Sequence, residues 1–208
     1  MKNIIIYGSG GFGRELAWII EQKCLKKVSC FVDDNNNGKI NNIEVISPSL
    51  GIKKYPKSNF IVSIGNPKIR KILTIKMLEY GLFPETIISP DVLYSSFVSF
   101  GEGNVICPGT IITCNIKIGN YNQINLGCTI GHDVIIKDFV TLSPGVHISG
   151  NVVIESGVFI GTGAVIINGT KDKPIKIGKN CIIGAGSCVT KDIISEKTVY
   201  GVPAKYKT

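Results

Sequence analysis

One pair of adjacent side chains in this sequence is well suited to proton transfer: His132 and Asp133. A neutral imidazole accepts a proton near pH 7, and a neighbouring carboxylate orients the ring and raises its basicity. The other histidine, His147, lies between two aliphatic residues, Val146 and Ile148, with no acid beside it. These residue types allow His132 to act as a general base, although a lone surface histidine usually has no catalytic role, and that is the interpretation we adopt for His147.

A second chemical signal is the segment Gly8-Ser9-Gly10-Gly11-Phe12-Gly13, which fits G-x-G-x-x-G. In such a turn, glycines let backbone amides approach a phosphate at a helix N-terminus. Asp33 follows Gly13 by 20 residues, a position typical of an acid that binds a ribose or a base. The alternative interpretation is a tight turn whose glycines only allow close packing.

The elements expected around this turn alternate between strand and helix. Strands are predicted at 3–7 and 28–32, a helix at 11–22, a buried run at 60–64, and a helix from Pro67 to Tyr80 that stops at Gly81. A complete dinucleotide-binding fold needs about 150 residues. A different repeat begins by residue 106, so the sequence predicts a single parallel βαβ unit of mononucleotide size.

From residue 106 onward the sequence repeats every six residues. The aliphatic positions are Ile106, Ile112, Ile118, Ile124, Ile130, Ile136, Leu142, Ile148, Ile154, Ile160 and Ile166. The repeat slips by five residues across 167–174 and resumes at Ile177, Ile183 and Val189. A hexapeptide repeat is the signature of a parallel β-helix, in which residues 18 apart stack on adjacent coils.

This register predicts where the chemical residues lie. With Ile130 and Val134 pointing inward, His132 and Asp133 fall at an exposed corner. Gly150 follows His132 by one coil of 18 residues, which places its N–H where it can stabilise an oxyanion. His147 faces outward from a flat side.

Composition narrows the class of protein. The chain has 208 residues, 44% hydrophobic and 18% charged, with 24 glycines. No apolar run reaches the roughly 18 residues of a membrane span, and the run before Gly8 is too short for a signal peptide, so we expect a cytoplasmic protein without membrane insertion. Seven cysteines without a Cys-x-x-Cys motif indicate no disulfide framework and no zinc ribbon. The net charge of +8 comes from scattered lysines, which does not favour nucleic-acid binding.

The glycine-rich opening, the hexapeptide repeat and the ending Tyr200-Gly201-Val202-Pro203-Ala204-Lys205 together resemble one family. It is the bacterial hexapeptide acyltransferases with an N-terminal Rossmann-like domain, the sialic acid O-acetyltransferase and UDP-4-amino-sugar N-acetyltransferase group. The resemblance implies a Rossmann-like α/β domain over 1–88 and a left-handed parallel β-helix over 89–208. It further implies an acetyl-CoA-dependent homotrimer, without a metal, whose active sites lie between subunits.

The resemblance implies that His132, paired with Asp133, is the catalytic base, and it also assigns residues to each ligand. The positions that face the nucleotide sugar are Gly10, Gly11, Phe12, Asp33 and Asp34, and Asn66 is expected to line the same crevice. Acetyl-CoA is expected to pass Thr141, Gly150, Thr162 and Ala185, with Pro203 and Lys205 near its nucleotide end. Phe12 and Thr141 differ from the polar residue and the histidine found there in the UDP-sugar enzymes.

Several functions are compatible with these residues. The first is N-acetylation of a nucleotide-linked 4-amino sugar in bacterial surface glycan synthesis, and the second is O-acetylation of sialic acid or a related sugar. A third is a non-catalytic trimer that binds a nucleotide sugar. A γ-type carbonic anhydrase is disfavoured because its zinc site needs three histidines and the chain has two.

Overall fold

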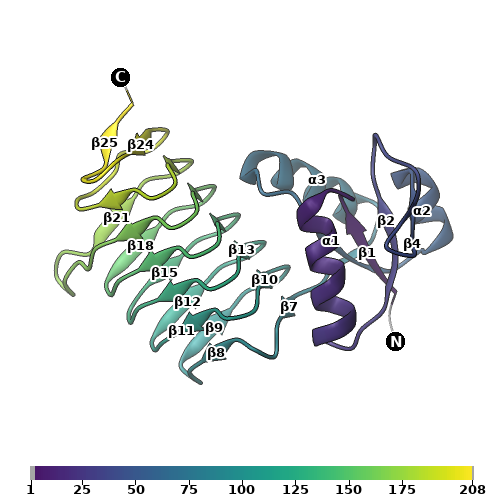
Figure 1. Cartoon of the computed structure of the whole chain (residues 1–208), viewed down its shortest axis with the longest axis horizontal. Coiled ribbons are helices and arrows are strands. Elements are labelled where there is room, and N and C mark those ends of the chain that lie inside the picture. The colour runs from purple at the N-terminus through teal and green to yellow at the C-terminus, as the bar shows by residue number, and fades with distance from the viewer. Residues whose placement is uncertain (1–2, 208) are drawn as a thin grey trace. The chain divides into compact units, whose positions relative to one another are not determined.

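A computed structural model describes residues 3–207, and the chain divides into two compact units (Figure 1). The first unit extends to Pro90 and the second begins at Asp91. The sequence placed this boundary between residues 88 and 89. No helix within 3–207 is both long and apolar enough to cross a bilayer.

The first unit is built on a six-stranded sheet with the order β3-β4-β2-β1-β5-β6. Only β3 runs antiparallel to its neighbour; the other pairs are parallel. The elements in chain order are β1 (Ile4–Tyr7), α1 (Gly11–Trp18), the π-helix η1 (Ile19–Lys23), β2 (Val28–Val32), β3 (Gly38–Ile40), β4 (Ile43–Ile46), α2 (Pro48–Lys54), β5 (Asn59–Val62), α3 (Pro67–Glu79), β6 (Phe83–Pro84) and β7 (Ile87–Ile88). The buried strands β1, β2 and β5 form the core.

The predicted βαβ unit is present, with two differences. The helix expected over 11–22 is α-helical only to Trp18, and its last turn is π-helical because the Cys24 N–H donates to the Ile19 carbonyl, five residues back. The sequence pattern also predicts no strand or helix between 38 and 54, where β3, β4 and α2 lie. The short β3–β4 hairpin adds an edge to the sheet without a strong hydrophobic period.

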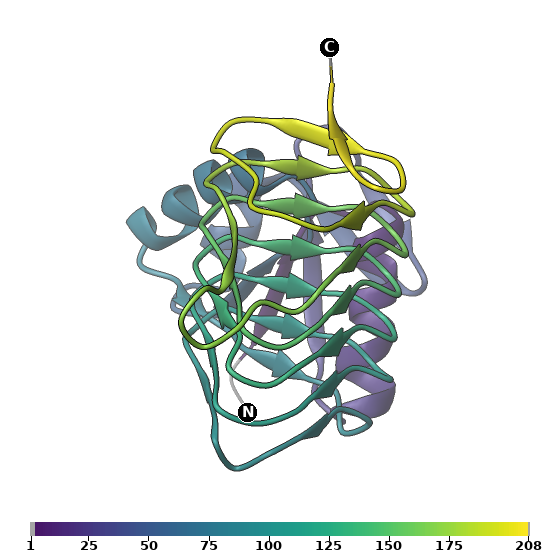
Figure 2. The same cartoon turned by 90° about the vertical axis from the view of Figure 1, so that its left-hand side faces the viewer.

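The second unit is the left-handed parallel β-helix, whose coils stack on one another in Figure 2. One side carries β10 (Val105–Ile106), β13 (Gln123–Ile124), β16 (Thr141–Leu142), β19 (Phe159–Ile160), β22 (Ile182–Ile183), β24 (Thr198–Tyr200) and the antiparallel β25 (Lys205–Tyr206). The second side carries β8 (Leu93–Tyr94), β11 (Ile111–Ile112), β14 (Thr129–Ile130), β17 (His147–Ile148), β20 (Val165–Ile166) and β23 (Cys188–Val189). The third carries β9 (Val98–Phe100), β12 (Ile116–Ile118), β15 (Ile135–Ile136), β18 (Val152–Ile154) and β21 (Ile175–Ile177).

The predicted register of this β-helix is confirmed. Residues 18 apart are paired, as in Ile112 with Ile130 and Ile130 with Ile148, and every predicted inward aliphatic residue is buried. The slip of five residues is also present, because Ile154 pairs with Ile177, 23 residues on. The burial of one continuous aliphatic row, coil against coil, holds the unit together.

The corners between strands share one backbone feature. Every sixth residue from 103 to 163 has a positive φ angle. One row of corners is entirely glycine, namely Gly109, Gly127, Gly145, Gly163 and Gly186. A second row contains Asn115, Asp133 and Asn151, residue types that tolerate the left-handed conformation better than most.

Candidate active site

The glycines of the turn after β1 fall into two kinds. A Cβ on Gly13 would collide with the Gly8 carbonyl oxygen, and Gly8 itself has φ +102°. Packing and backbone conformation therefore explain these two glycines. A Cβ on Gly10 or Gly11 would meet nothing within 4 Å, so packing does not explain the other two. Their exposed backbone at the start of α1 is open to a ligand.

Asp33 is bonded to this turn from within the chain. Its Oδ2 accepts hydrogen bonds from the Ser9 amide (2.9 Å) and hydroxyl (2.6 Å), and its Oδ1 accepts from the Asn35 and Asn36 amides. Burial alone would raise the pKa of Asp33, but these hydrogen bonds outweigh it and lower the pKa to about 2. Asp33 thus fixes the turn, a function that its spacing alone did not reveal.

The neighbouring Asp34 is exposed and accepts a hydrogen bond of 2.6 Å from the Tyr7 hydroxyl. Burial, followed by this bond, raises the pKa of Tyr7 well above its ordinary value. Tyr7 ends β1 and Asp34 follows β2, so both lie at the carboxyl edge of the sheet, where ligands bind in open α/β sheets.

The next loop along this edge is shaped by two polar side chains. Asn66 caps α3, with its Oδ1 accepting from the Lys68 and Ile69 amides at 3.0 and 3.2 Å. Arg70 is 2% exposed and donates to the carbonyls of Ile64 and Gly65. Burial lowers the pKa of Arg70 to about 9. Arg70 therefore shapes the loop from inside.

The His132 corner has the predicted geometry. The imidazole Nδ1 lies 2.8 Å from Asp133 Oδ2, and the two side chains are 56% and 46% exposed. The hydrogen bond with His132, followed by one from Asn115, lowers the pKa of the Asp133 carboxyl. An ionised carboxylate at Nδ1 holds a proton there and leaves Nε2 as the basic nitrogen.

Gly150 lies directly against this imidazole. A Cβ at position 150 would stand 2.5 Å from both Cε1 and Nε2 of His132, closer than real Cβ contacts. Glycine is thus the residue that lets the ring rest on the next coil. Within residues 3–207, the Gly150 N–H has no hydrogen-bond acceptor, whereas its carbonyl accepts from Gly169.

The remaining predicted residues differ in exposure. Thr162 and Ala185 are exposed on one corner row, and Pro203 and Lys205 are exposed in the C-terminal tail. Thr141 is only 2% exposed, in contrast to the open contact expected for a cofactor. Phe12 is half-buried, and His147 is exposed on a flat side with Nδ1 2.8 Å from the Thr129 hydroxyl.

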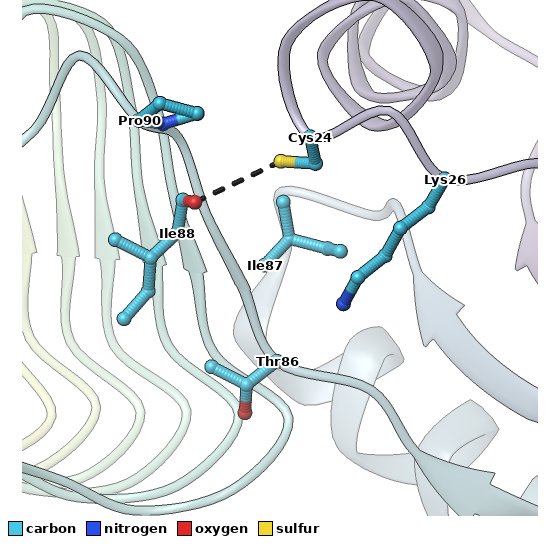
Figure 3. A pocket seen from close by; sticks show the side chains of 6 residues that line it. All are labelled: Cys24, Lys26, Thr86, Ile87, Ile88 and Pro90. Atoms are coloured by element: carbon cyan, nitrogen blue, oxygen red, sulfur yellow. Dashed lines mark hydrogen bonds between the residues drawn. The ribbon is translucent and has the colours of Figure 1, made fainter.

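A pocket in the first unit is distinct from these residues (Figure 3). It is lined by Cys24, Lys26, Thr86, Ile87, Ile88 and Pro90. The Cys24 thiol contacts the Ile88 carbonyl oxygen at 3.7 Å, and burial raises the pKa of Cys24. This thiol is therefore less ionised than a free cysteine. None of the predicted site residues lines the pocket.

A Rossmann-like unit followed by a β-helix with an exposed His–Asp corner defines the class of hexapeptide-repeat acyltransferases. Residues 3–77 match the family model of the PglD N-terminal domain. GDP-perosamine N-acetyltransferase of Escherichia coli O157:H7 is 38% identical over 207 residues, 96% of this chain and 94% of the relative. The chain belongs to the bacterial hexapeptide-repeat sugar acetyltransferases with an N-terminal Rossmann-like domain, as the sequence resemblance indicated.

Solved structures of other proteins are similar to this chain over its whole length. WeeI from Acinetobacter baumannii AYE has a TM-score of 0.95 at 36% identity, covering 100% of both chains. A variant of perosamine N-acetyltransferase from Caulobacter crescentus, in complex with CoA and GDP-perosamine, has a TM-score of 0.92 at 27% identity, covering 100% of this chain and 98% of that one. The protein is an acyltransferase with acetyl-CoA as its co-substrate. Residues 3–207 contain no cluster of side chains suited to a metal ion.

Proposed function

We propose that the protein acetylates the amine of a nucleotide-linked 4-amino sugar, with His132 as the general base. This proposal rests on the position of the His132 imidazole. Its Nδ1 is hydrogen-bonded to Asp133, and its Nε2 lies against Gly150 on the next coil. The substrate class is supported by the E. coli relative, a GDP-perosamine N-acetyltransferase, and by the Caulobacter structure with GDP-perosamine. A GDP-linked sugar is therefore the first substrate to test.

The reaction is a direct transfer. The sugar amine attacks the thioester carbonyl carbon, and Nε2 of His132 takes the proton that the nitrogen loses. The Gly150 N–H donates to the oxygen that becomes negatively charged in the tetrahedral intermediate. The C–S bond then breaks, the amide forms, and the CoA thiolate leaves and takes up a proton. Asp133 holds the imidazole in the tautomer that this sequence needs.

The nucleotide part of the substrate is assigned to the first unit. The Gly10 and Gly11 amides at the start of α1 would receive the phosphates, beside Phe12. We assign Asp34 to binding the ribose or the base, and Asn66 to the wall of the same crevice. Asp33 supports the site by fixing the turn through Ser9.

Acetyl-CoA is assigned to the corner row of Thr162 and Ala185, with Pro203 and Lys205 near its nucleotide end. The exposure of all four residues supports this path. Thr141, whose side chain is 2% exposed in the single chain, is assigned to the wall of the acetyl-CoA path.

The assembly we infer is a homotrimer that acts in the cytoplasm in surface glycan synthesis. The outward-facing Ile135, Val153 and Phe159 retain partial exposure on the flat sides of the β-helix. Closed cyclic symmetry would bury such side chains without generating fibres. Sedimentation at micromolar concentration should give three times the mass of the 22.4 kDa chain, and a monomeric mass would contradict the trimer.

The function is tested by thiol release from acetyl-CoA with a panel of acceptors. The panel contains GDP-, UDP- and dTDP-linked 4-amino sugars and free sialic acid. We expect turnover with a nucleotide-linked amino sugar, GDP-linked first. Turnover of free sialic acid alone would favour O-acetylation, and binding of nucleotide sugars without thiol release from any acceptor would favour a non-catalytic protein.

A further inference from the structure

Helices α2 and α3 lie on the same side of the sheet in the first unit. Ile52 of α2 and Leu73 of α3 pack against one buried cluster, which contains Met77 of α3 and residues of β1, β2, β4 and β5. Within residues 3–207, α1 contributes no member of this cluster. We call the outward surface of this helical layer, over residues 48–57 and 67–80, the α2–α3 face.

The α2–α3 face exposes a stripe of aliphatic side chains. α3 buries one side through Arg70, Thr74 and Met77, yet its aliphatic residues continue at intervals of three away from the core. Helical positions three apart are neighbours on the helix surface, so these side chains form a continuous stripe. The exposed aliphatic residues are Ile69, Ile72, Ile75 and Leu78 on α3 and Leu50 on α2. A helix that is apolar on both sides has a second surface that is stabilised by burial.

The same two segments are basic. Residues 48–57 and 67–80 contain six lysines at exposed or half-buried positions and a single acid, Glu79. The lysines are Lys53, Lys54, Lys57, Lys68, Lys71 and Lys76. One of them, Lys54, pairs with Glu44 of β4 at 2.5 Å. By contrast, α1 and η1, over 11–23, carry two basic and two acidic residues. The α2–α3 face therefore combines a net positive charge with exposed aliphatic side chains.

We propose that the α2–α3 face binds peripherally to the surface of an anionic lipid bilayer. Such a surface offers negatively charged headgroups to the lysines and, just below them, an acyl boundary to the aliphatic stripe. The two helices would lie in the plane of the interface, and no segment would cross the bilayer. A second copy of the chain that used the same face would bring like charges together, which disfavours that occupant. The proposal goes beyond acetyl transfer and does not depend on the role of His132.

The test is cosedimentation of the full chain with sucrose-loaded vesicles of phosphatidylcholine, with and without phosphatidylglycerol. We expect binding to the anionic vesicles at about 0.1 M salt, at least about fivefold weaker binding to phosphatidylcholine alone, and loss of binding at about 0.5 M salt, because salt screens the lysines. Lys53→Glu combined with Lys71→Glu should weaken binding at least about tenfold by reversing two charges of the face. Ile72→Ser should weaken it about fivefold by removing apolar contact.

Each variant has a matched control outside the α2–α3 face. Lys27→Glu combined with Lys39→Glu makes the same change of charge elsewhere in the first unit. Ile194→Ser removes a side chain that is 64% exposed in the second unit, against 66% for Ile72. Both controls should bind vesicles within about twofold of the parent.

Three outcomes would overturn the proposal. They are no binding of the parent to anionic vesicles, equal losses in the control variants, and a smaller sedimenting mass of Ile72→Ser without vesicles, which would assign the face to a contact between copies. Thiol release from acetyl-CoA should persist in every variant and report that each is folded. Its absence from the parent would contradict the proposed function and leave the vesicle result unaffected.

Discussion

The two candidate sites both depend on glycine, but they differ in what occupies the space that the missing side chain leaves. At the turn after β1, a Cβ on Gly10 or Gly11 would meet no atom of the chain within 4 Å. At the β-helix corner, the space beside Gly150 holds the imidazole of His132. The open space at the first site suits the binding of an external ligand. The filled space at the second site suits a side chain that is held in one position for catalysis.

The backbone contributes differently to the two sites. The glycine-rich turn is a single feature, fixed by Asp33 and by the close approach of Gly13 to Gly8. The corner of Asp133 repeats a left-handed conformation found at every sixth residue from 103 to 163. In the β-helix, therefore, the side chain rather than the backbone distinguishes the His132–Asp133 corner from the others.

The largest effect should come from His132→Ala. Loss of the general base should lower turnover by about 10² to 10⁴. The variant should remain folded and bind acetyl-CoA, because the residue is an exposed corner side chain whose removal costs within about 0.5 kcal/mol. His147→Ala should stay within a few-fold of the parent, since that ring lies on a flat side, where its Nδ1 is 2.8 Å from the Thr129 hydroxyl. Steady-state thiol release measures the turnover of both variants. Equal losses of turnover would contradict the distinction between the two histidines.

Gly150→Ala should lower kcat by about tenfold to a hundredfold, because the new Cβ displaces the imidazole from its position. The backbone N–H is retained, so the effect should pass through His132. In a His132→Ala background the same substitution should therefore add little. A double-mutant cycle on kcat checks this, and full additivity would mean that Gly150 acts without the histidine.

Gly13→Ala and Gly10→Ala should separate packing from binding in the first unit. Gly13→Ala should destabilise the unit by about 1 to 3 kcal/mol because its Cβ collides with the Gly8 carbonyl. Gly10→Ala, at φ −68° and in open space, should change stability by less than about 0.5 kcal/mol but raise KM for the nucleotide sugar. Urea unfolding followed by Trp18, the single tryptophan, reports this unit. An unchanged KM in Gly10→Ala would contradict the binding of the substrate's phosphates at this turn.

The smallest expected effect concerns acid stability. Because folding lowers the pKa of Asp33 to about 2, the ionised carboxylate stabilises the first unit above its ordinary pKa of 3.8. This contribution should be lost as the pH falls toward 2. Between pH 6 and pH 3, the urea midpoint read from Trp18 should fall more in the parent than in Asp33→Asn. An equal fall would show that the bonds to Ser9 contribute little.

The two units were predictable to different degrees. The register of the β-helix followed from sequence because each coil repeats one inward pattern, so that His132 and Gly150 could be paired by adding 18. The same arithmetic would have found Asn115 beneath Asp133. The path of residues 167–174 could not be found this way, because it depends on hydrogen bonds within the loop and on the bond from the Gly169 N–H to the Gly150 carbonyl.

In the first unit, the turn and its flanking strand were predicted, but its internal bonding was not. The spacing of Asp33 matched that of a ribose-binding acid, yet its oxygens accept from Ser9, Asn35 and Asn36. Such contacts depend on loops from two strands meeting at one edge, which no local pattern specifies. For the same reason the burial of Arg70 and Thr141 was not apparent from sequence.

The central claim is that the protein transfers acetyl to the nitrogen of a nucleotide-linked 4-amino sugar. The most direct measurement is NMR of the product formed from [1-¹³C]acetyl-CoA and GDP-perosamine. We predict a ¹³C carbonyl signal of an amide that is coupled to the nitrogen on the sugar's C4 and is stable to hydroxylamine. A hydroxylamine-labile ester on a sugar hydroxyl, or no labelled sugar at all, would contradict the account.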